Sequence, residues 1–214
     1  MKKLLILFFI STFSFAQNKI KSQQIIDNEK FQGIINRIET FPSKYITPRT
    51  VDIWLPKDYS SNKKYSVLYM HDGQMLFDAT TTWNKQEWMV DEVSTKLMQE
   101  NKTDDFIVVA IWNISQIRHT DLYPKKPFQL LSIEQKNKVL VEAKKSQFAF
   151  DENKINSDNY LKFIVEELKP YVDKNFSVYT DANHTAIMGS SMGGLISMYA
   201  ICEYPKVFGK AACL

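Results

Sequence analysis

The chain has 214 residues, of which 44% are hydrophobic, with 27 basic and 24 acidic residues. This length and composition are typical of one globular domain with a single substantial core. The charge is nearly balanced, and no stripe of basic residues interleaved with aromatic residues is present, which excludes a nucleic-acid-binding surface of the usual electrostatic kind. No Cys/His cluster has the spacing of a zinc site and no internal repeat is visible, so we expect no metal site and no repeat architecture.

The first sixteen residues have the pattern of a Sec-type signal peptide. Two lysines precede an apolar run over residues 4–10, and Ser14 and Ala16 supply the small residues that signal peptidase inspects. The run is shorter than the roughly 20 residues that span a bilayer, which disfavours a membrane anchor. We expect cleavage after Ala16, a domain over 17–214 with 25 basic and 24 acidic residues, and a secreted or periplasmic protein.

Cys202 and Cys213 are the two cysteines of the chain. An exported chain of this size with two cysteines is not a disulfide scaffold. Both lie in apolar sequence, so we expect buried free thiols rather than a bridge.

Four strands are predicted in the first half of the chain. Apolar and polar residues alternate over 33–41 and 49–56, as in half-buried antiparallel strands. Nearly continuous apolar runs over 65–70 and 106–112 are typical of strands buried on both faces.

Helices are predicted between and after these strands. Asn84 is expected to cap a helix through about Glu100, with Trp88 on its apolar, core-facing stripe. A long irregular segment then passes the residues around Arg118, and a second helix is expected over 132–148.

The last third of the chain continues the alternation of helix and strand. A helix is expected over 157–174, a short strand over 185–188, a helix over 195–203 and a strand from 209 onwards. This order predicts an α/β domain with a mainly parallel sheet, helices on both faces and antiparallel strands at its N-terminal edge. Ligands collect at the carboxyl ends of strands in such sheets.

Residues 189–194 have the sequence Gly-Ser-Ser-Met-Gly-Gly between a predicted strand and a predicted helix. In the G-x-S-x-G pattern the serine occupies a strained strand-to-helix turn that exposes its hydroxyl. Gly189 and Gly193 leave room for that turn. The pattern predicts Ser191 as a nucleophile, which requires a neighbouring base to take its proton.

Acyl transfer also requires preorganised N–H donors for the oxyanion. The turn itself supplies the N–H of Met192, and the second donor normally comes from the loop after the third strand. That loop covers residues 71–78 here, and Gly73 lets its backbone turn inward. We assign the second donor to Gln74, with Gly73 as the alternative.

Several motifs together resemble one known family. They are His71-Asp72-Gly73-Gln74-Met75-Leu76-Phe77-Asp78, Thr82-Trp83-Asn84, Trp88 with Asp91-Glu92, and the Gly189–Gly194 turn. In this order they resemble the family of α/β-hydrolase esterases that contains esterase D and the enterochelin, feruloyl and acetylxylan esterases, over residues 31–214. The resemblance implies an α/β-hydrolase fold and ester hydrolysis without a cofactor, with Ser191 as nucleophile and the Met192 and Gln74 amides as oxyanion hole. The substrate is then a small-molecule or carbohydrate-linked ester.

Candidate substrate contacts lie on the same edge of the sheet. Trp83 could stack on a sugar or on an aromatic acyl group. Arg118 and Asp121 could recognise substrate or form structural ion pairs. Residues 125–156 are expected to form a variable wall of the substrate site.

No histidine of the chain fits the role of base. The 23 residues after Ser191 contain no histidine and only one carboxylate, Glu203. His184 begins the strand that ends at Ser191, and six residues at ~3.3 Å each place it roughly 20 Å away. His71 is expected to shape the 71–78 loop, and nothing in the sequence around His119 orients it.

The chain ends in sequence typical of a buried strand. We therefore expect a C-terminally truncated fragment of a longer esterase, whose missing strands carry the acid and the histidine beyond Leu214, and we expect the 214-residue chain alone to be inactive. A non-catalytic binding module on a hydrolase frame and an acyltransferase using the same acyl-enzyme are the alternatives. The downstream reading frame distinguishes the first, and product analysis with an added acceptor distinguishes the second. The oligomeric state is not predicted.

Overall fold

The computed structural model describes residues 20–27, 29–145 and 150–214. The predicted signal peptide over 1–16 lies outside these residues. None of the helices in the described part of the chain is both long and apolar enough to cross a membrane.

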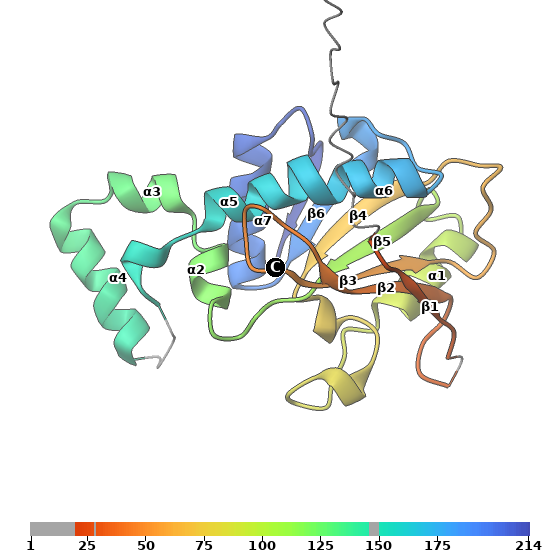
Figure 1. The fold of residues 1–214 in the computed structure, drawn as a ribbon, viewed down its shortest axis with the longest axis horizontal. Helices are drawn as coiled ribbons and strands as arrows, with labels where there is room; N and C mark the ends of the chain where they lie inside the picture. Colours follow the sequence, from red (N-terminus) through yellow and green to blue (C-terminus); the bar gives the residue numbers. More distant parts are fainter. Residues whose placement is uncertain (1–19, 28, 146–149) are drawn as a thin grey trace, which may run out of the picture.

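The described residues form one mixed sheet of seven strands in the order β1-β2-β3-β5-β4-β6-β7 (Figure 1). Its strands are β1 (Gln23–Ile25), β2 (Ile34–Phe41), β3 (Arg49–Leu55), β4 (Ser66–His71), β5 (Phe106–Ile111), β6 (Thr185–Gly189) and β7 (Lys210–Cys213). The pairs from β1 through β3 to β5 are antiparallel, whereas β5, β4, β6 and β7 run parallel. The predicted α/β architecture is confirmed, with its antiparallel strands at the N-terminal edge.

The register places the carboxyl ends of the parallel strands at one edge. His71 pairs with Ile111, and Gly189 pairs with Cys213. The loops after β4, β5 and β6 therefore leave the sheet side by side.

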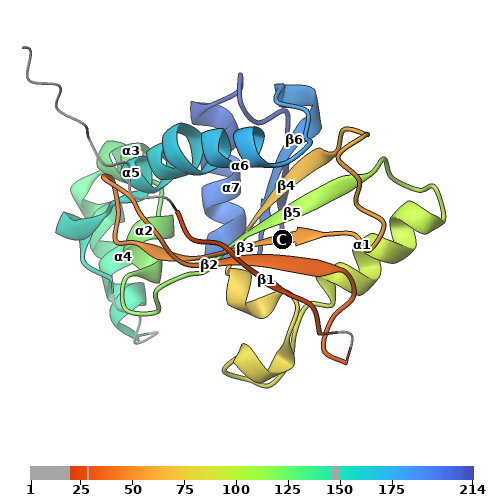
Figure 2. The same cartoon turned by 45° about the vertical axis from the view of Figure 1, so that its right-hand side comes forward.

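Helices cover both faces of the sheet. The α-helices are α1 (Val90–Gln99), α2 (Arg118–Leu122), α3 (Lys125–Leu130), α4 (Ile133–Lys145), α5 (Ser157–Lys162), α6 (Lys169–Asn175) and α7 (Met192–Glu203). A π-helical turn, η4 (Phe163–Leu168), joins α5 to α6, and the 3-10 turns are η1 (Gly73–Met75), η2 (Ala79–Thr81), η3 (Glu152–Lys154) and η5 (Ala182–His184). In Figure 2, α5–α6 and α7 lie on one side of the sheet and α1 lies on the other.

The larger core lies between the sheet and the helices α5 to α7. Ile53, Tyr69 and Ile187 of the sheet belong to the same buried cluster as Phe163 and Ile196, and all five side chains are fully buried. Each such side chain contributes about 1.5–3 kcal/mol relative to an exposed one. This core fixes the helix that follows Ser191 against the sheet.

A smaller core lies on the α1 face. Trp54, Met70 and Val108 of the sheet pack there with Leu76, and Val90 of α1 lies against them. The residues after β4 are thereby held against this face.

The helix predicted from Asn84 to about Glu100 begins later, at Val90, so the predicted start and the Asn84 cap are wrong, whereas its end is confirmed. The N–H of Trp88 donates to the Met75 carbonyl oxygen at 2.9 Å, and the N–H of Val90 donates to that of Leu76 at 3.1 Å. Backbone donors that a helix would use are therefore bonded to the loop after β4, and the chain enters α1 through Met89 with φ of 53°.

Two other helix predictions also differ from the structure. The irregular segment around Arg118 contains α2 and α3, and Pro127 is tolerated because it lies in the first turn of α3, where N–H groups have no helical partner. Helix α7 begins at Met192, three residues earlier than expected. The predicted end of the 132–148 helix lies outside the described residues, of which Lys145 is the last in α4.

Cys202 and Cys213 are free but exposed, so the expectation of buried thiols is wrong. Cys213 lies on β7, which is the edge strand of the described sheet. One neighbouring strand alone does not cover its side chain.

Candidate active site

Ser191 occupies a strained turn between β6 and α7. Its φ is 56° and its ψ is −116°, a combination that non-glycine residues rarely adopt. The Gly193 N–H closes the turn by donating to the Ser190 carbonyl oxygen at 2.8 Å. The first hydrogen bond of the helix runs from the Leu195 N–H to the Ser191 carbonyl oxygen at 3.0 Å. The Ser191 residue is exposed at the head of α7.

A glycine at position 189 is required by the close approach of the two sides of this turn. A Cβ added at Gly189 would lie 2.6 Å from the Gly193 carbonyl carbon. The end of β7 supports the same turn, because the Ser191 N–H donates to the Leu214 carbonyl oxygen at 2.7 Å and the Leu214 N–H donates to that of Gly189 at 3.0 Å.

The loop after β4 lies directly beside this turn. A Cβ added at Gly193 would lie 3.3 Å from the His71 Cβ and 3.5 Å from the Asp72 Oδ2. The structure therefore brings together the two segments, 71–78 and 189–194, that the sequence analysis placed at one edge.

The backbone of the 71–78 loop is itself unusual. Asp72 has φ of 58° and ψ of 44°, the left-handed conformation, and η1 follows it immediately. A Cβ at Gly73 would lie 2.8 Å from both the Ala110 carbonyl carbon and the Trp112 Cδ1, so only glycine fits against β5. The Gln74 side chain accepts a hydrogen bond from the Asn113 N–H at 3.1 Å.

A buried ion pair fixes Asp72. The Arg118 Nε and Nη2 atoms donate to its two carboxylate oxygens at 2.7 Å each, and the Asn113 Nδ2 donates to Oδ1 at 2.6 Å. Burial opposes the charge of this carboxyl, yet Arg118 and Asn113 hold the pKa of Asp72 below its ordinary value. Arg118 therefore forms the structural ion pair that was one of its two predicted roles, and its contact with substrate stays a prediction.

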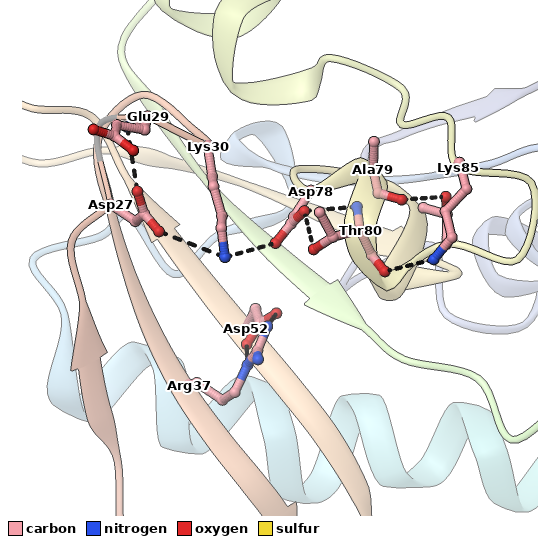
Figure 3. Close-up of polar contacts among 10 residues, drawn as sticks. Asp27, Glu29, Lys30, Arg37, Asp52, Asp78, Ala79, Thr80 and Lys85 are labelled. Atoms are coloured by element: carbon pink, nitrogen blue, oxygen red, sulfur yellow. Dashed lines mark hydrogen bonds and ion pairs between the residues drawn. The ribbon is translucent and has the colours of Figure 1, made fainter.

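A second set of polar contacts lies beside the same loop and involves residues of β2, of β3 and of the segment between β1 and β2 (Figure 3). The Arg37 Nε and Nη2 atoms donate to the Asp52 carboxylate at 2.7 and 2.8 Å, and the Trp112 Nε1 donates to Asp52 Oδ2 at 2.9 Å. Lys30 lies between Asp27, at 3.6 Å, and Asp78, at 3.9 Å. Of these contacts, the pair of Lys30 with Asp78 reaches the 71–78 loop itself.

His71 is fully buried at the end of β4. Its Nδ1 is 2.8 Å from the Tyr160 hydroxyl, and burial lowers the pKa of His71 to about 4. Next to it, the Arg49 Nη2 donates to Asp121 at 2.8 Å, with side chains only 2% and 4% exposed. This network joins β3, β4, α2 and α5 beneath the site, and Asp121 belongs to it.

The other two histidines lie in different places. His184 lies in η5, at the opposite end of β6 from Ser191. His119 lies in α2 and shares a cavity wall with Met192, and its pKa is lowered by burial and by Arg118.

Trp83 and Trp88 are both surface residues. Trp83 is 87% exposed, which is compatible with either of its predicted roles. Trp88 precedes α1 and is 36% exposed, so the prediction that it belongs to the core is wrong.

Sequence reasoning missed the roles of Asn113, Tyr160 and Arg49. Asn113 directly follows the strand predicted over 106–112, and that position is the signal that could have identified it. The hydroxyl of Tyr160 lies on a helical stripe that predicts core packing alone, and the pairing of Arg49 with a residue 72 positions away leaves no local signal.

A family model described as "Putative esterase" matches residues 44–214. The chain belongs to this esterase family. The uncharacterized protein YbbA of Bacillus subtilis is 24% identical over 163 residues, which cover 76% of this chain and 54% of YbbA. An endo-1,4-beta-xylanase/feruloyl esterase of Xylanibacter ruminicola is 24% identical over 166 residues, 75% of this chain and 18% of that protein.

Solved structures of esterases share the fold. A ferulic acid esterase from Anaeromyces mucronatus, in complex with ferulic acid, has a TM-score of 0.53 at 22% identity, covering 97% of this chain and 63% of its own. The enterobactin esterase of Shigella flexneri has a TM-score of 0.55 at 18% identity, covering 86% and 37%. This esterase chain spans about half the length of the curated Bacillus relatives that it matches, 54% and 59%.

Proposed function

We propose that the protein is an exported serine carboxylesterase that acts on an ester of the acyl-polysaccharide or siderophore type. The observation that carries this proposal is the strained backbone of Ser191, which exposes this residue beside the left-handed turn of the 71–78 loop. Family membership supports ester hydrolysis as the class of reaction. The proposal of export rests on the sequence of residues 1–16.

In the proposed reaction, the Ser191 Oγ attacks the carbonyl carbon of the ester while a base takes its proton. The negative charge moves to the carbonyl oxygen, where the N–H groups of Met192 and Gln74 stabilise it, with Gly73 as the alternative second donor. The carbonyl re-forms as the bond to the alcohol breaks, and the alcohol leaves with the proton. Water then attacks the acyl-enzyme, releasing the acid and restoring Ser191.

We propose that the base and its orienting carboxylate come from outside these 214 residues. His71 is fully buried against Tyr160, and His184 lies at the opposite end of β6. His119 lies nearer to Met192, but Asp121, the nearest carboxylate in the sequence, is bound to Arg49 and so does not serve as its orienting acid. Trp83 remains a candidate contact for the alcohol or the acyl group, because it is exposed after the 71–78 loop.

Hydrolysis of 4-nitrophenyl acetate and of a feruloyl ester by the complete product of the gene tests the proposal. We expect turnover that Ser191→Ala abolishes, and no Ser191-dependent turnover by the 214-residue chain alone. Turnover that survives Ser191→Ala would show that the nucleophile is elsewhere. An added alcohol or sugar acceptor distinguishes hydrolysis from acyl transfer, since transfer yields a new ester.

A further inference from the structure

A cavity of about 380 Å³ lies between α2, α4 and the first residue of α7. Its wall includes His119, Tyr123, Val139, Ala143, Phe150 and Met192. Met192 directly follows Ser191, and consecutive Cα atoms are about 3.8 Å apart. The cavity therefore begins within one residue of the proposed nucleophile.

Aromatic side chains hold the wall of this cavity in place. The Tyr123 ring lies 5.6 Å from the Phe128 ring and 5.0 Å from the Phe150 ring, and Phe128 and Phe150 are 6.1 Å apart. Such edge and tilted contacts are favourable geometries for aromatic pairs. In Figure 1, α3 and α4 stand beyond the end of the sheet. The aromatic cluster ties α3 to the end of α2, and the Lys136 Nζ of α4 lies 5.7 Å from the centre of the Phe128 ring.

The two charged side chains of the wall, Lys138 and Glu142, each pair with a neighbour. Lys138 pairs with Glu134 at 2.9 Å, and Glu142 pairs with Lys145 at 2.7 Å, each within α4. Burial raises the pKa of the Tyr123 hydroxyl, and the pKa of His119 is lowered by burial, so both side chains are neutral at pH 7. A ligand that enters this cavity meets a mainly apolar wall, in which Lys138 and Glu142 are each paired and carry opposite charges.

We propose that this cavity binds the acyl group of the substrate, that it takes a bulky, uncharged acyl group, and that Val139 and Ala143 of α4 set the size limit. This inference rests on the proposed function, because it places the acyl carbon at Ser191. Pockets of about 300–1,000 Å³ hold drug-sized ligands, so an acetyl group would leave most of this cavity unfilled. One methylene in an apolar pocket changes selectivity by about 10–200-fold, and a charged acyl group would lose its hydration against the mainly apolar wall.

The test compares three esters with the same leaving group on the complete product of the gene. They are 4-nitrophenyl acetate, 4-nitrophenyl cinnamate and 4-nitrophenyl hemisuccinate. We expect kcat/KM for the cinnamate to exceed that for the other two by about tenfold or more. Equal values for the three esters, or a preference for acetate or hemisuccinate, would overturn the inference.

Variants of α4 locate the selectivity in the cavity. Ala143→Trp fills it and is expected to lower the ratio of kcat/KM for the cinnamate to kcat/KM for the acetate by about tenfold or more. Val141→Trp is the matched control, because Val141 is on the same helix, is 50% exposed and does not line the cavity. If Ala143→Trp fails to fold by circular dichroism, Val139→Phe replaces it.

Failure of this inference is distinguishable from failure of the proposed function. Ser191-dependent hydrolysis with an unchanged cinnamate-to-acetate ratio in the folded α4 variant refutes the cavity as the acyl site and leaves the esterase standing. Absence of Ser191-dependent hydrolysis for all three esters refutes the proposed function and this inference with it.

Discussion

Replacing Arg118 with methionine should destabilise the protein and slow its reaction, because Arg118 holds Asp72 at the start of the 71–78 loop. The substitution keeps an apolar stem but removes both donors at 2.7 Å. The Asp72 side chain is only 4% exposed, so its charge would remain buried with Asn113 as its remaining donor among these contacts.

The magnitude follows from the burial of the pair. Removing one partner of a fully buried ion pair costs about 3–5 kcal/mol. The Arg118 side chain is 21% exposed, so water reaches the position in part. We therefore expect a loss of about 2–3 kcal/mol in the free energy of unfolding, measured by urea denaturation at pH 7.

A double-mutant cycle separates the ion pair from a general loss of packing. Asp72→Asn suits the left-handed backbone, which asparagine tolerates, and removes the buried charge. The pair of substitutions should therefore cost less than the sum of the two single ones, with a coupling energy of about 1–3 kcal/mol. The control is Lys63→Met, whose bridge to Asp105 has side chains 41% and 42% exposed and should change stability by less than about 0.5 kcal/mol.

Acid and kinetics provide two further readouts. Because the pKa of Asp72 is lowered in the folded protein, the stability that the ion pair adds is fully present above about pH 4, the ordinary pKa of an aspartate. This stability is lost as pH falls through the folded pKa, so the difference in unfolding free energy between wild type and Arg118→Met should shrink there. In the complete gene product, misplacing the proposed oxyanion donor of the 71–78 loop should lower kcat by about 10–100-fold with KM little changed. A variant as stable and as active as wild type would refute the role of Arg118.

Three further predictions concern His71, Asp91 and Ser191. The free energy of unfolding should fall by about 3 kcal/mol from pH 6.5 to pH 4, because burial lowers the pKa of His71 to about 4 in the folded protein, whereas the unfolded chain binds this proton near pH 6.5. In urea titrations, His71→Gln should reduce this dependence on pH. Burial raises the pKa of Asp91 to about 7, so Asp91→Asn should stabilise the protein by about 2 kcal/mol at pH 8, and this gain should shrink as pH falls from 7 to 4. An equal gain in unfolding free energy at pH 8 and at pH 4 would contradict this prediction. Ser191→Gly should be more stable than Ser191→Ala by about 1 kcal/mol in thermal denaturation, because glycine relieves the positive φ that alanine retains, and equal stability would remove the argument for strain.

The parallel core of the fold could be predicted because its signals are local. The apolar runs over 65–70 and 106–112 have the length and composition of strands buried on both faces, and the structure confirms both as β4 and β5. The start of α1 could not be predicted from Asn84, because the deciding hydrogen bonds from Trp88 and Val90 go to carbonyls of a loop more than ten residues earlier. These tertiary contacts, rather than the capping residue, determine where the helix begins.

In the candidate site too, residues in short motifs could be predicted from the sequence, whereas residues that act through long-range pairing could not. Ser191 and Gln74 are identified by short motifs, and the structure brings their two segments together. The residues that hold those segments, Arg118 against Asp72 and Tyr160 against His71, are 46 and 89 positions apart from their partners. Their pairing depends on the folded chain, so no spacing in the sequence reveals it.

The most direct test of the central claim is covalent labelling of Ser191. The complete gene product is treated with a fluorophosphonate, digested and analysed by mass spectrometry, beside Ser191→Ala and a sample preincubated with an ester substrate. We predict one adduct, on the peptide that contains Ser191, absent from the variant and reduced by the substrate. An adduct on a different residue, or no adduct from a protein that still hydrolyses esters, would contradict the assignment of Ser191 as the nucleophile.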